Sequence, residues 1–212
     1  MSDSGIEVVL LERTIEGSGL SSVSVDNFTG GYLATNHLFQ QFGRDVFHVG
    51  QSSGSSILRK RMEGWKSALT EQGFGKTDHL LFEIGISDEV LATDFEAQAR
   101  AGYDAAKKII TDMPRQKGGW SIFAAKDLIA TGIYKAAEEL GMKIGQEVAV
   151  VGFGDGPVAK HLSPPMSSIF RVRSELGYAA AKLSCQLISE RPQIAMHEVM
   201  PVKLMIRESS SE

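Results

Sequence analysis

Short apolar runs alternate along the chain with longer segments of helical period. The runs are rich in Val, Ile and Phe and are bounded by glycine, proline or polar residues, which is typical of buried strands. Strands are predicted at residues 6–11, 22–25, 45–50, 79–84, 120–125, 147–153 and 199–206. Because helical segments lie between most of these runs, the order predicts an α/β fold with a mainly parallel sheet.

Three of the helical segments carry a clear apolar stripe. Residues recurring at helical spacing predict a helix from about residue 55 to residue 72, through Leu58, Met62, Trp65 and Leu69. Two further stripes are formed by Ile129, Ile133, Ala136 and Leu140, ended by Gly141, and by Leu176, Ala180, Leu183 and Leu187. Such stripes indicate packing, so no site is assigned to them. The polar ends MSDSG and ESSSE are expected to be mobile.

The composition limits the classes of function. The 212 residues, 42% hydrophobic and 23% charged, suffice for one large domain or two small lobes. A net charge of -4 gives no general attraction to nucleic acid or to an anionic membrane. The single Cys185 cannot form an internal disulfide, which fits a reducing compartment, and no apolar run approaches the ~18 residues of a membrane span. These features predict a cytoplasmic protein.

A glycine-rich turn invites a nucleotide-binding interpretation, which its spacing does not support. In VVGFGDGP, residues 150–157, the third glycine of a dinucleotide fingerprint is replaced by Pro157. The segment that follows is interrupted by Pro164 and Pro165, so it is not an unbroken helix whose N–H groups could hold a phosphate. The five histidines show no metal-binding spacing. We therefore predict neither a cofactor nor a metal.

A second motif leaves an enzymatic alternative open. GQSSG, residues 50–54, fits the G-x-S-x-G nucleophile elbow and lies between a predicted strand and a predicted helix. Ser52 would be the nucleophile, and the acid and base would come from Asp127 or Asp155 and from His161 or His197. Serine and glycine are also common in binding loops, so a serine hydrolase is a remote alternative to a non-enzymatic protein.

Four blocks of the sequence resemble the effector-binding core of LacI-type transcriptional regulators. They are VSVDNFTGGYLATNHLFQQFGRDVFHVG from Val23, RKRMEGWKSAL from Arg59, SIFAAKDLIATGIYKAAEELGMKIGQEVAVVGFGD from Ser121 and PPMSSI from Pro164. The resemblance implies a periplasmic-binding-protein-like fold of parallel sheets, a sugar or sugar derivative as effector, and no enzymatic activity. Periplasmic sugar-binding proteins share this two-lobed fold, so solute binding for transport is the alternative function.

The resemblance covers one complete lobe and one partial lobe. Residues 27–170 with 197–212 correspond to the C-terminal lobe, and residues 1–26 with 171–196 correspond to a remnant of the N-terminal lobe. No helix-turn-helix candidate precedes residue 27. We therefore expect operator DNA to be contacted only through a headpiece missing from these residues. We also expect a homodimer, because the open sheet edge of a partial lobe favours pairing with another chain.

The resemblance also implies where the effector binds. Loops at residues 50–56, 125–127 and 152–156 follow strands and are expected to converge at the carboxyl ends of the sheet. Arg61 matches a position where the family holds sugar hydroxyls or a carboxylate, a task that suits the fixed donors of a guanidinium. The other residues assigned to effector binding are Lys126, Asp127, Arg171, Ser52, Ser53, Ser55, Phe153 and Asp155.

Three departures from the family pattern favour a negatively charged effector. Lys126 replaces the usual asparagine, Gly154 replaces an aspartate that accepts hydrogen bonds from sugar hydroxyls, and Arg171 adds a further cation. Buried like charges are costly unless paired, so such a site favours a sugar phosphate or sugar acid over a neutral sugar. The alternative is that Lys126 and Arg171 point to solvent or pair with nearby acids, namely Asp127, Asp155 or Glu175.

Overall fold

The structure is a computed structural model, and it describes residues 6–15, 17–52, 54–190, 192 and 194–211. The chain divides into two compact units. The first unit is Met1–Asp26 with Arg171–Val202, and the second unit is Asn27–Phe170 with Lys203–Glu212. Each unit contains its own sheet, and both sheets are mainly parallel, which confirms the predicted α/β class.

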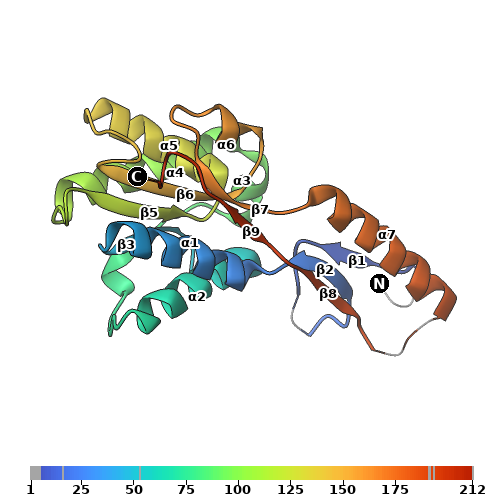
Figure 1. Ribbon diagram of the computed structural model, residues 1–212. Coiled ribbons are helices and arrows are strands. Elements are labelled where there is room, and N and C mark those ends of the chain that lie inside the picture. The colour runs from blue at the N-terminus through green and yellow to red at the C-terminus, as the bar shows by residue number, and fades with distance from the viewer. Residues whose placement is uncertain (1–5, 16, 53, 191, 193, 212) are drawn as a thin grey trace. The chain divides into compact units, whose positions relative to one another are not determined.

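The first unit contains a three-stranded parallel sheet in the order β1-β2-β8. Its strands are β1 (Val9–Leu11), β2 (Ser21–Val25) and β8 (His197–Met200). One long helix, α7 (Arg173–Glu190), packs against β1 and β2 (Figure 1). The helix buries Leu176, Leu183 and Leu187 of the predicted stripe, but it buries Ala179 in place of Ala180, which is half-buried.

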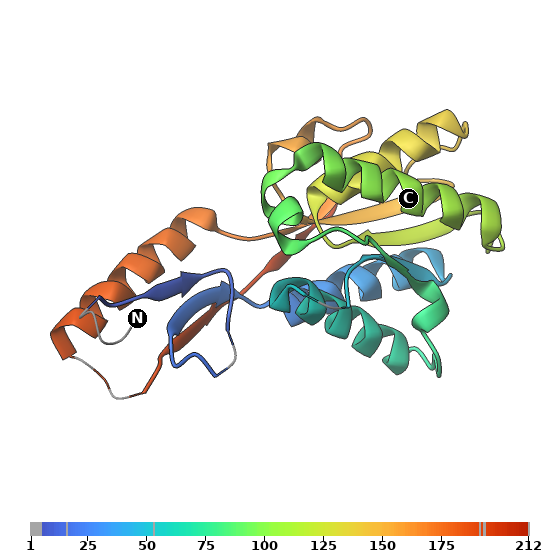
Figure 2. The same cartoon turned by 180° about the vertical axis from the view of Figure 1, so that it is seen from behind.

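The second unit contains a six-stranded sheet in the order β4-β3-β5-β6-β7-β9. Five strands are parallel, and β9 is antiparallel to β7. Helices α1 and α2 cover one face, and α4 and α5 cover the other (Figures 1 and 2). The bounds are α1 Asn27–Phe42, β3 Val46–Gly50, α2 Ser56–Glu71, η2 Asp78–Leu80, β4 Leu81–Glu83, α3 Asp88–Thr93, α4 Phe95–Asp112, β5 Trp120–Ala124, α5 Asp127–Glu139, β6 Val148–Gly154, α6 Pro157–His161, β7 Ser167–Phe170 and β9 Lys203–Met205.

The core of the second unit lies between its sheet and the two helix layers. Every residue of β3, β5 and β6 is buried, as expected for central strands covered on both faces. The predicted stripe of α2 is buried, with Trp65 fully enclosed and its indole N–H donating to the carbonyl of Val46 over 2.8 Å. Gly141 follows α5 with a φ of 67°, which explains why the helix ends there.

One predicted strand, residues 199–206, is wrong as a single element. Its first part belongs to β8, which pairs with β2 in the first unit, and its second part forms β9, which pairs with β7 in the second unit. Pro201 lies between them, and without an N–H it cannot continue a strand ladder. Residues 197–202 therefore belong to the first unit, and the boundary falls after Val202 instead of after residue 196.

The C-terminal residues are held in the second unit, so the expectation of a mobile ESSSE tail is wrong. Ser209 and Ser210 are fully buried. The Ser209 hydroxyl donates to the carbonyl of Val150 over 2.6 Å and accepts from the amide of Ser167 over 2.8 Å. The ring of His37 lies 2.8 Å from the Ser210 hydroxyl. The polar composition of the segment indicated mobility. These tertiary hydrogen bonds hold the segment in place, and no local sequence pattern predicts them.

Candidate functional site

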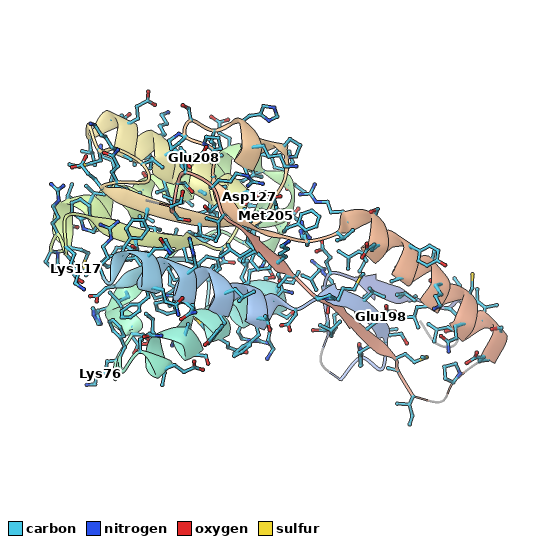
Figure 3. All side chains as sticks on the ribbon, viewed as in Figure 1. Lys76, Lys117, Asp127, Glu198, Met205 and Glu208 are labelled. Atoms are coloured by element: carbon cyan, nitrogen blue, oxygen red, sulfur yellow. The ribbon has the colours of Figure 1, made fainter. Side chains whose placement is uncertain are left out.

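The sequence-selected residues of the second unit gather at one edge of its sheet. Because β4, β3, β5, β6 and β7 run in the same direction, their carboxyl ends share this edge. Ser52 follows β3, Lys126 and Asp127 follow β5, and Asp155 follows β6. Figure 3 labels Asp127 here and Lys76 well away from it. The three loops expected to converge therefore lie along one edge.

Arg61 lies on α2 and is almost completely buried, with 4% of its surface exposed. Its Nε donates to Asn27 Oδ1 over 2.9 Å, and its Nη1 donates to the carbonyl of Ala125 over 2.6 Å. The guanidinium also stacks on Phe153, with its carbon 3.4 Å from the ring centroid. Burial lowers the pKa of Arg61 to about 9, while the charge of Asp127 acts in the opposite direction. Arg61 thus connects the start of α1 with the ends of β5 and β6.

Lys126 immediately precedes α5 and is half-buried. Its Nζ donates to the carbonyl of Leu91 in α3 over 2.7 Å. Burial, and secondarily the charge of Arg61, lowers the pKa of Lys126 to about 8. Within the part of the chain that the structure describes, neither Lys126 nor Arg61 forms an ion pair with a carboxylate. The edge thus holds two neighbouring cations whose hydrogen-bond acceptors are neutral.

Asp127 begins α5, and both of its carboxylate oxygens are engaged. Oδ1 accepts from the hydroxyl of Ser168 on β7 over 2.6 Å, and Oδ2 accepts from the amide of Gly156 over 3.0 Å. Burial raises the pKa of Asp127, and these two hydrogen bonds oppose that effect. A Cβ at residue 152 would lie 2.5 Å from Oδ1, which explains the glycine there. Asp127 therefore fastens the loop after β6 to β7.

Asp155 is held by a cation of the C-terminal segment. Its carboxylate lies 2.7 Å from Nη1 of Arg207, and its amide donates to the hydroxyl of Ser168 over 3.0 Å. The backbone of Asp155 is left-handed, with a φ of 46°, which aspartate tolerates better than most residues. The sequence alone assigns Asp155 to the loop, but its partner Arg207 lies 52 positions along the chain and could not be identified from the pattern.

Arg171 differs from the other two cations of the expected group in having an ion-pair partner. It belongs to the first unit, where its guanidinium forms an ion pair with Glu12. Burial lowers the pKa of Arg171 to about 10, and the neighbouring charge of Arg173 adds to the effect. Pairing of Arg171 with an acid was the alternative expected from the sequence, but the acids expected were Asp127, Asp155 and Glu175. Because its charge is compensated by Glu12, only Arg61 and Lys126 remain as cations without an ion pair among the described site residues.

The serine loop after β3 is joined to the segment that follows β4. The hydroxyl of Ser52 donates to the carboxylate of Glu83, and the amide of Ser55 donates to Asp88 Oδ1 over 3.1 Å. Ser53 lies outside the described residues. Gln51, which the sequence analysis did not select, is buried and donates through Nε2 to the carbonyl of Ile86, while its Oε1 has no partner among the described residues. The signal in the sequence that could have identified Gln51 is its position directly after a predicted strand.

The geometry does not assemble the serine-hydrolase alternative. The hydroxyl of Ser52 contacts Glu83, whereas a nucleophile of this class contacts the ring of a histidine. His161 pairs through Nδ1 with the carbonyl of Pro157, and His197 pairs with Ser22 in the first unit. Across residues 6–15, 17–52, 54–190, 192 and 194–211, no hydrogen bond joins Ser52 to a histidine.

The described residues contain neither a metal-ligand cluster nor a membrane-spanning helix. No three of their His, Cys, Asp and Glu side chains come together in an arrangement that could bind a metal ion. No helix in the described part of the chain combines the length and apolar character needed to cross a bilayer.

Comparison with known proteins identifies relatives across nearly the whole chain. The model of the periplasmic binding protein-like domain family matches residues 35–210. The ribose operon repressor of Haemophilus influenzae is 29% identical over 180 residues, which are 85% of this chain and 50% of that protein. The HTH-type transcriptional repressor PurR of Yersinia enterocolitica is 30% identical over 207 residues, which are 97% of this chain and 56% of that protein. The chain thus spans about half the length of these relatives.

The fold is also similar to solved structures of regulators. A putative transcription regulator from Staphylococcus saprophyticus superposes with a TM-score of 0.83 and 26% identity, over 99% of this chain and 72% of the other. A LacI family transcriptional regulator from Enterococcus faecium, solved with bound ribose, superposes with a TM-score of 0.80 and 22% identity over the same shares of the two chains. At 22% identity, the second likeness shows the fold alone.

Proposed function

The chain belongs to the family of periplasmic binding protein-like domains, and from this premise we propose that it is the effector-binding core of a LacI-type transcriptional regulator. The supporting observation is the edge of the second unit, where buried Arg61 is held by the carbonyl of Ala125 beside Lys126 and Asp127. In open parallel sheets, ligands bind outside the carboxyl ends of the strands, and this edge is where those ends meet. The ligand class is a sugar or sugar derivative, bound without making or breaking a covalent bond.

The relatives support a regulatory role for the ligand. The two curated relatives named above are transcriptional repressors, and one is a ribose operon repressor. Binding of the effector at the strand ends and binding of operator DNA by the whole regulator would bias the same conformational equilibrium, so each changes the affinity of the other. We assign DNA contact to a separate segment of the regulator, because a net charge of -4 supplies no general attraction to phosphate. Such a regulator acts in the cytoplasm.

Calorimetric titration of Arg61→Met with the sugar that binds wild-type protein best tests this assignment. We expect at least about tenfold weaker binding, because the side chain that organises the edge loses its charge and its donors. Arg59→Met on the same helix is the matched control, since the Arg59 side chain is 37% exposed and lies beside Glu63. Melting curves establish that both variants fold. Equal affinity in Arg61→Met and wild type would refute the proposal.

A solute-binding protein for sugar transport is the second candidate function, because the matching family model describes a periplasmic binding protein-like domain. The two candidates differ in what the gene encodes upstream in the same reading frame. A helix-turn-helix there supports the regulator, and a signal peptide there supports the transport protein.

A homodimer is the proposed assembly. The first unit has a sheet with β1 at one edge and β8 at the other, and Leu11 on β1 and Val199 on β8 are 49% and 60% exposed. Open edges with exposed apolar side chains favour pairing with a second chain. Sedimentation of the purified protein measures the state directly, and a monomer at all accessible concentrations would contradict it.

A further inference from the structure

Among the described residues, Lys126 and Arg61 are neighbouring cations without an ion pair, and Lys126 lacks even the partial compensation that the charge of Asp127 gives Arg61. The carbonyl that accepts from Arg61 Nη1 belongs to Ala125, whose peptide bond continues into Lys126, so the guanidinium lies beside the start of the lysine. The ammonium of Lys126 donates to the carbonyl of Leu91. The second hydrogen bond of Arg61 goes to the side-chain oxygen of Asn27. These acceptors are neutral, so the positive charge is oriented but not cancelled.

The nearest acid in the sequence acts on Arg61 through its charge but forms no ion pair with Lys126 among the described residues. Asp127 directly follows Lys126, but its two carboxylate oxygens accept from Ser168 and Gly156. Asp155 pairs with Arg207, and Glu83 is bonded to Ser52. Asp127, Asp155 and Glu83 are therefore each held by contacts of their own and not by Lys126.

Lys126 is the member of the pair that can reach a ligand. Its ammonium carries three N–H donors, of which one is directed to Leu91, so two remain for another acceptor. The side chain is half-buried, whereas Arg61 is 4% exposed and holds neighbouring residues. An anion placed against Lys126 also lies in the field of Arg61 and near the positive end of the 13-residue helix α5.

From this geometry we propose that the effector carries a phosphate or carboxylate group and that Lys126 is the specificity-determining residue that binds it. This inference rests on the proposed effector-binding function and names the chemical class of its ligand. A negatively charged group supplies the compensation that Lys126, half-buried beside the Arg61 cation, lacks. A neutral sugar hydroxyl cannot supply it, and would compete with water for the same donors.

The proposal has a pH signature, since only the protonated amine attracts an anion. The pKa of Lys126, lowered to about 8, places its deprotonation within an accessible range. The charged groups on the elements around it are Arg61 on α2, Asp88 and Glu89 on α3, Asp127 on α5 and Asp155 after β6. Affinity for an anionic sugar is therefore highest near pH 7 and falls as the pH rises through about 8.

Matched pairs of sugars test the proposal by calorimetry on the 212-residue chain. The pairs are D-ribose with D-ribose 5-phosphate, and D-glucose with D-glucose 6-phosphate and D-gluconate. We expect the best anionic sugar to bind at least about tenfold tighter than its neutral parent near pH 7, and to lose about tenfold in affinity between about pH 7 and about pH 9. Lys126→Asn should abolish the preference. Lys126→Arg should keep the preference and reduce the loss above pH 8, and the loss that remains comes from Arg61, whose pKa is about 9.

Lys76→Asn is the matched control, because it removes the same charge from an exposed position that Figure 3 shows well away from Asp127. It should retain the preference of wild-type protein. The inference is overturned, with the proposed function intact, if neutral sugars bind as tightly as anionic ones or if Lys126→Asn keeps the wild-type preference. Binding of no sugar of either kind to wild-type protein would contradict the proposed function as well.

Discussion

His48 provides a sharp test of the core of the second unit, because the protein buries this ring in its neutral form. The side chain lies in the middle of β3 and has no exposed surface. Its ring stacks on Phe123 with centroids 4.8 Å apart and on Trp65 with centroids 5.4 Å apart. Nδ1 donates to the carbonyl of Phe123 over 3.1 Å, and Nε2 has no partner among the described residues. A second proton, on Nε2, would therefore find no acceptor.

The cost of that proton can be worked out from the structure. Burial lowers the pKa of His48 from 6.5 to about 4, and the charge of Arg61 adds to the effect. The difference of about 2.5 pKa units corresponds to about 3 kcal/mol, at 1.36 kcal/mol per unit. The unfolded chain takes up the proton near pH 6.5 and the folded chain only near pH 4. The stability that depends on a neutral His48, about 3 kcal/mol, is thus complete above pH 6.5 and is lost as the pH falls from 6.5 to 4.

His48→Phe isolates the effect, because it keeps an aromatic ring in the stack and removes the titrating group. Urea unfolding followed by tryptophan fluorescence between about pH 7 and about pH 4 reports on the second unit alone, since the chain has two tryptophans, Trp65 and Trp120, and both lie there. The variant should begin about 1 kcal/mol less stable, through the lost hydrogen bond, and should lose about 3 kcal/mol less on acidification.

The acid-unfolding experiment must separate His48 from a second buried histidine and from a general weakening of the aromatic stack. His37, whose pKa burial also lowers, contributes to acid sensitivity in both proteins, so it cancels in the difference between them. Phe123→Leu keeps His48 and weakens the stack, and it should lower stability by about 1 kcal/mol at every pH. If His48→Phe loses as much stability as wild type on acidification, the ring is not buried in its neutral form and the reasoning is refuted.

Three further variants test packing, two in the second unit and one in α7 of the first unit. Gly132→Ala should destabilise the second unit by about 2 kcal/mol in urea unfolding, because the new Cβ would lie 1.8 Å from the carbonyl oxygen of Ala99 in α4. Gly177→Ala in α7, where nothing lies within 4 Å of the new Cβ, should instead stabilise the first unit by about 0.5 kcal/mol. Equal effects at the two sites would contradict the close approach of α4 and α5. Ser209→Ala should cost about 1–3 kcal/mol, because it leaves the buried amide of Ser167 without its acceptor, and unchanged melting would show that the C-terminal segment is not held as described.

The arrangement of the site was only partly accessible from the sequence. Lys126 and Asp127 were selected because they follow a recognisable strand, and the parallel register does bring them to the edge that Arg61 supports. Their different roles were not visible. Adjacent in sequence, Lys126 is held by a neutral carbonyl, whereas Asp127 is committed to Ser168, which lies 41 positions away.

The α/β class, the apolar stripes of α2 and α5, most of that of α7 and the order of most strands could be predicted from the sequence, because strand and helix periodicity record which side of each element is buried. The pairing of Arg171 with Glu12, the burial of Ser209 and Ser210, and the assignment of β8 and β9 to different sheets appear only in the folded chain. These features depend on groups far apart along the chain, which local periodicity does not encode. A charge is compensated, and a polar tail is ordered, only by the partners that folding brings to it.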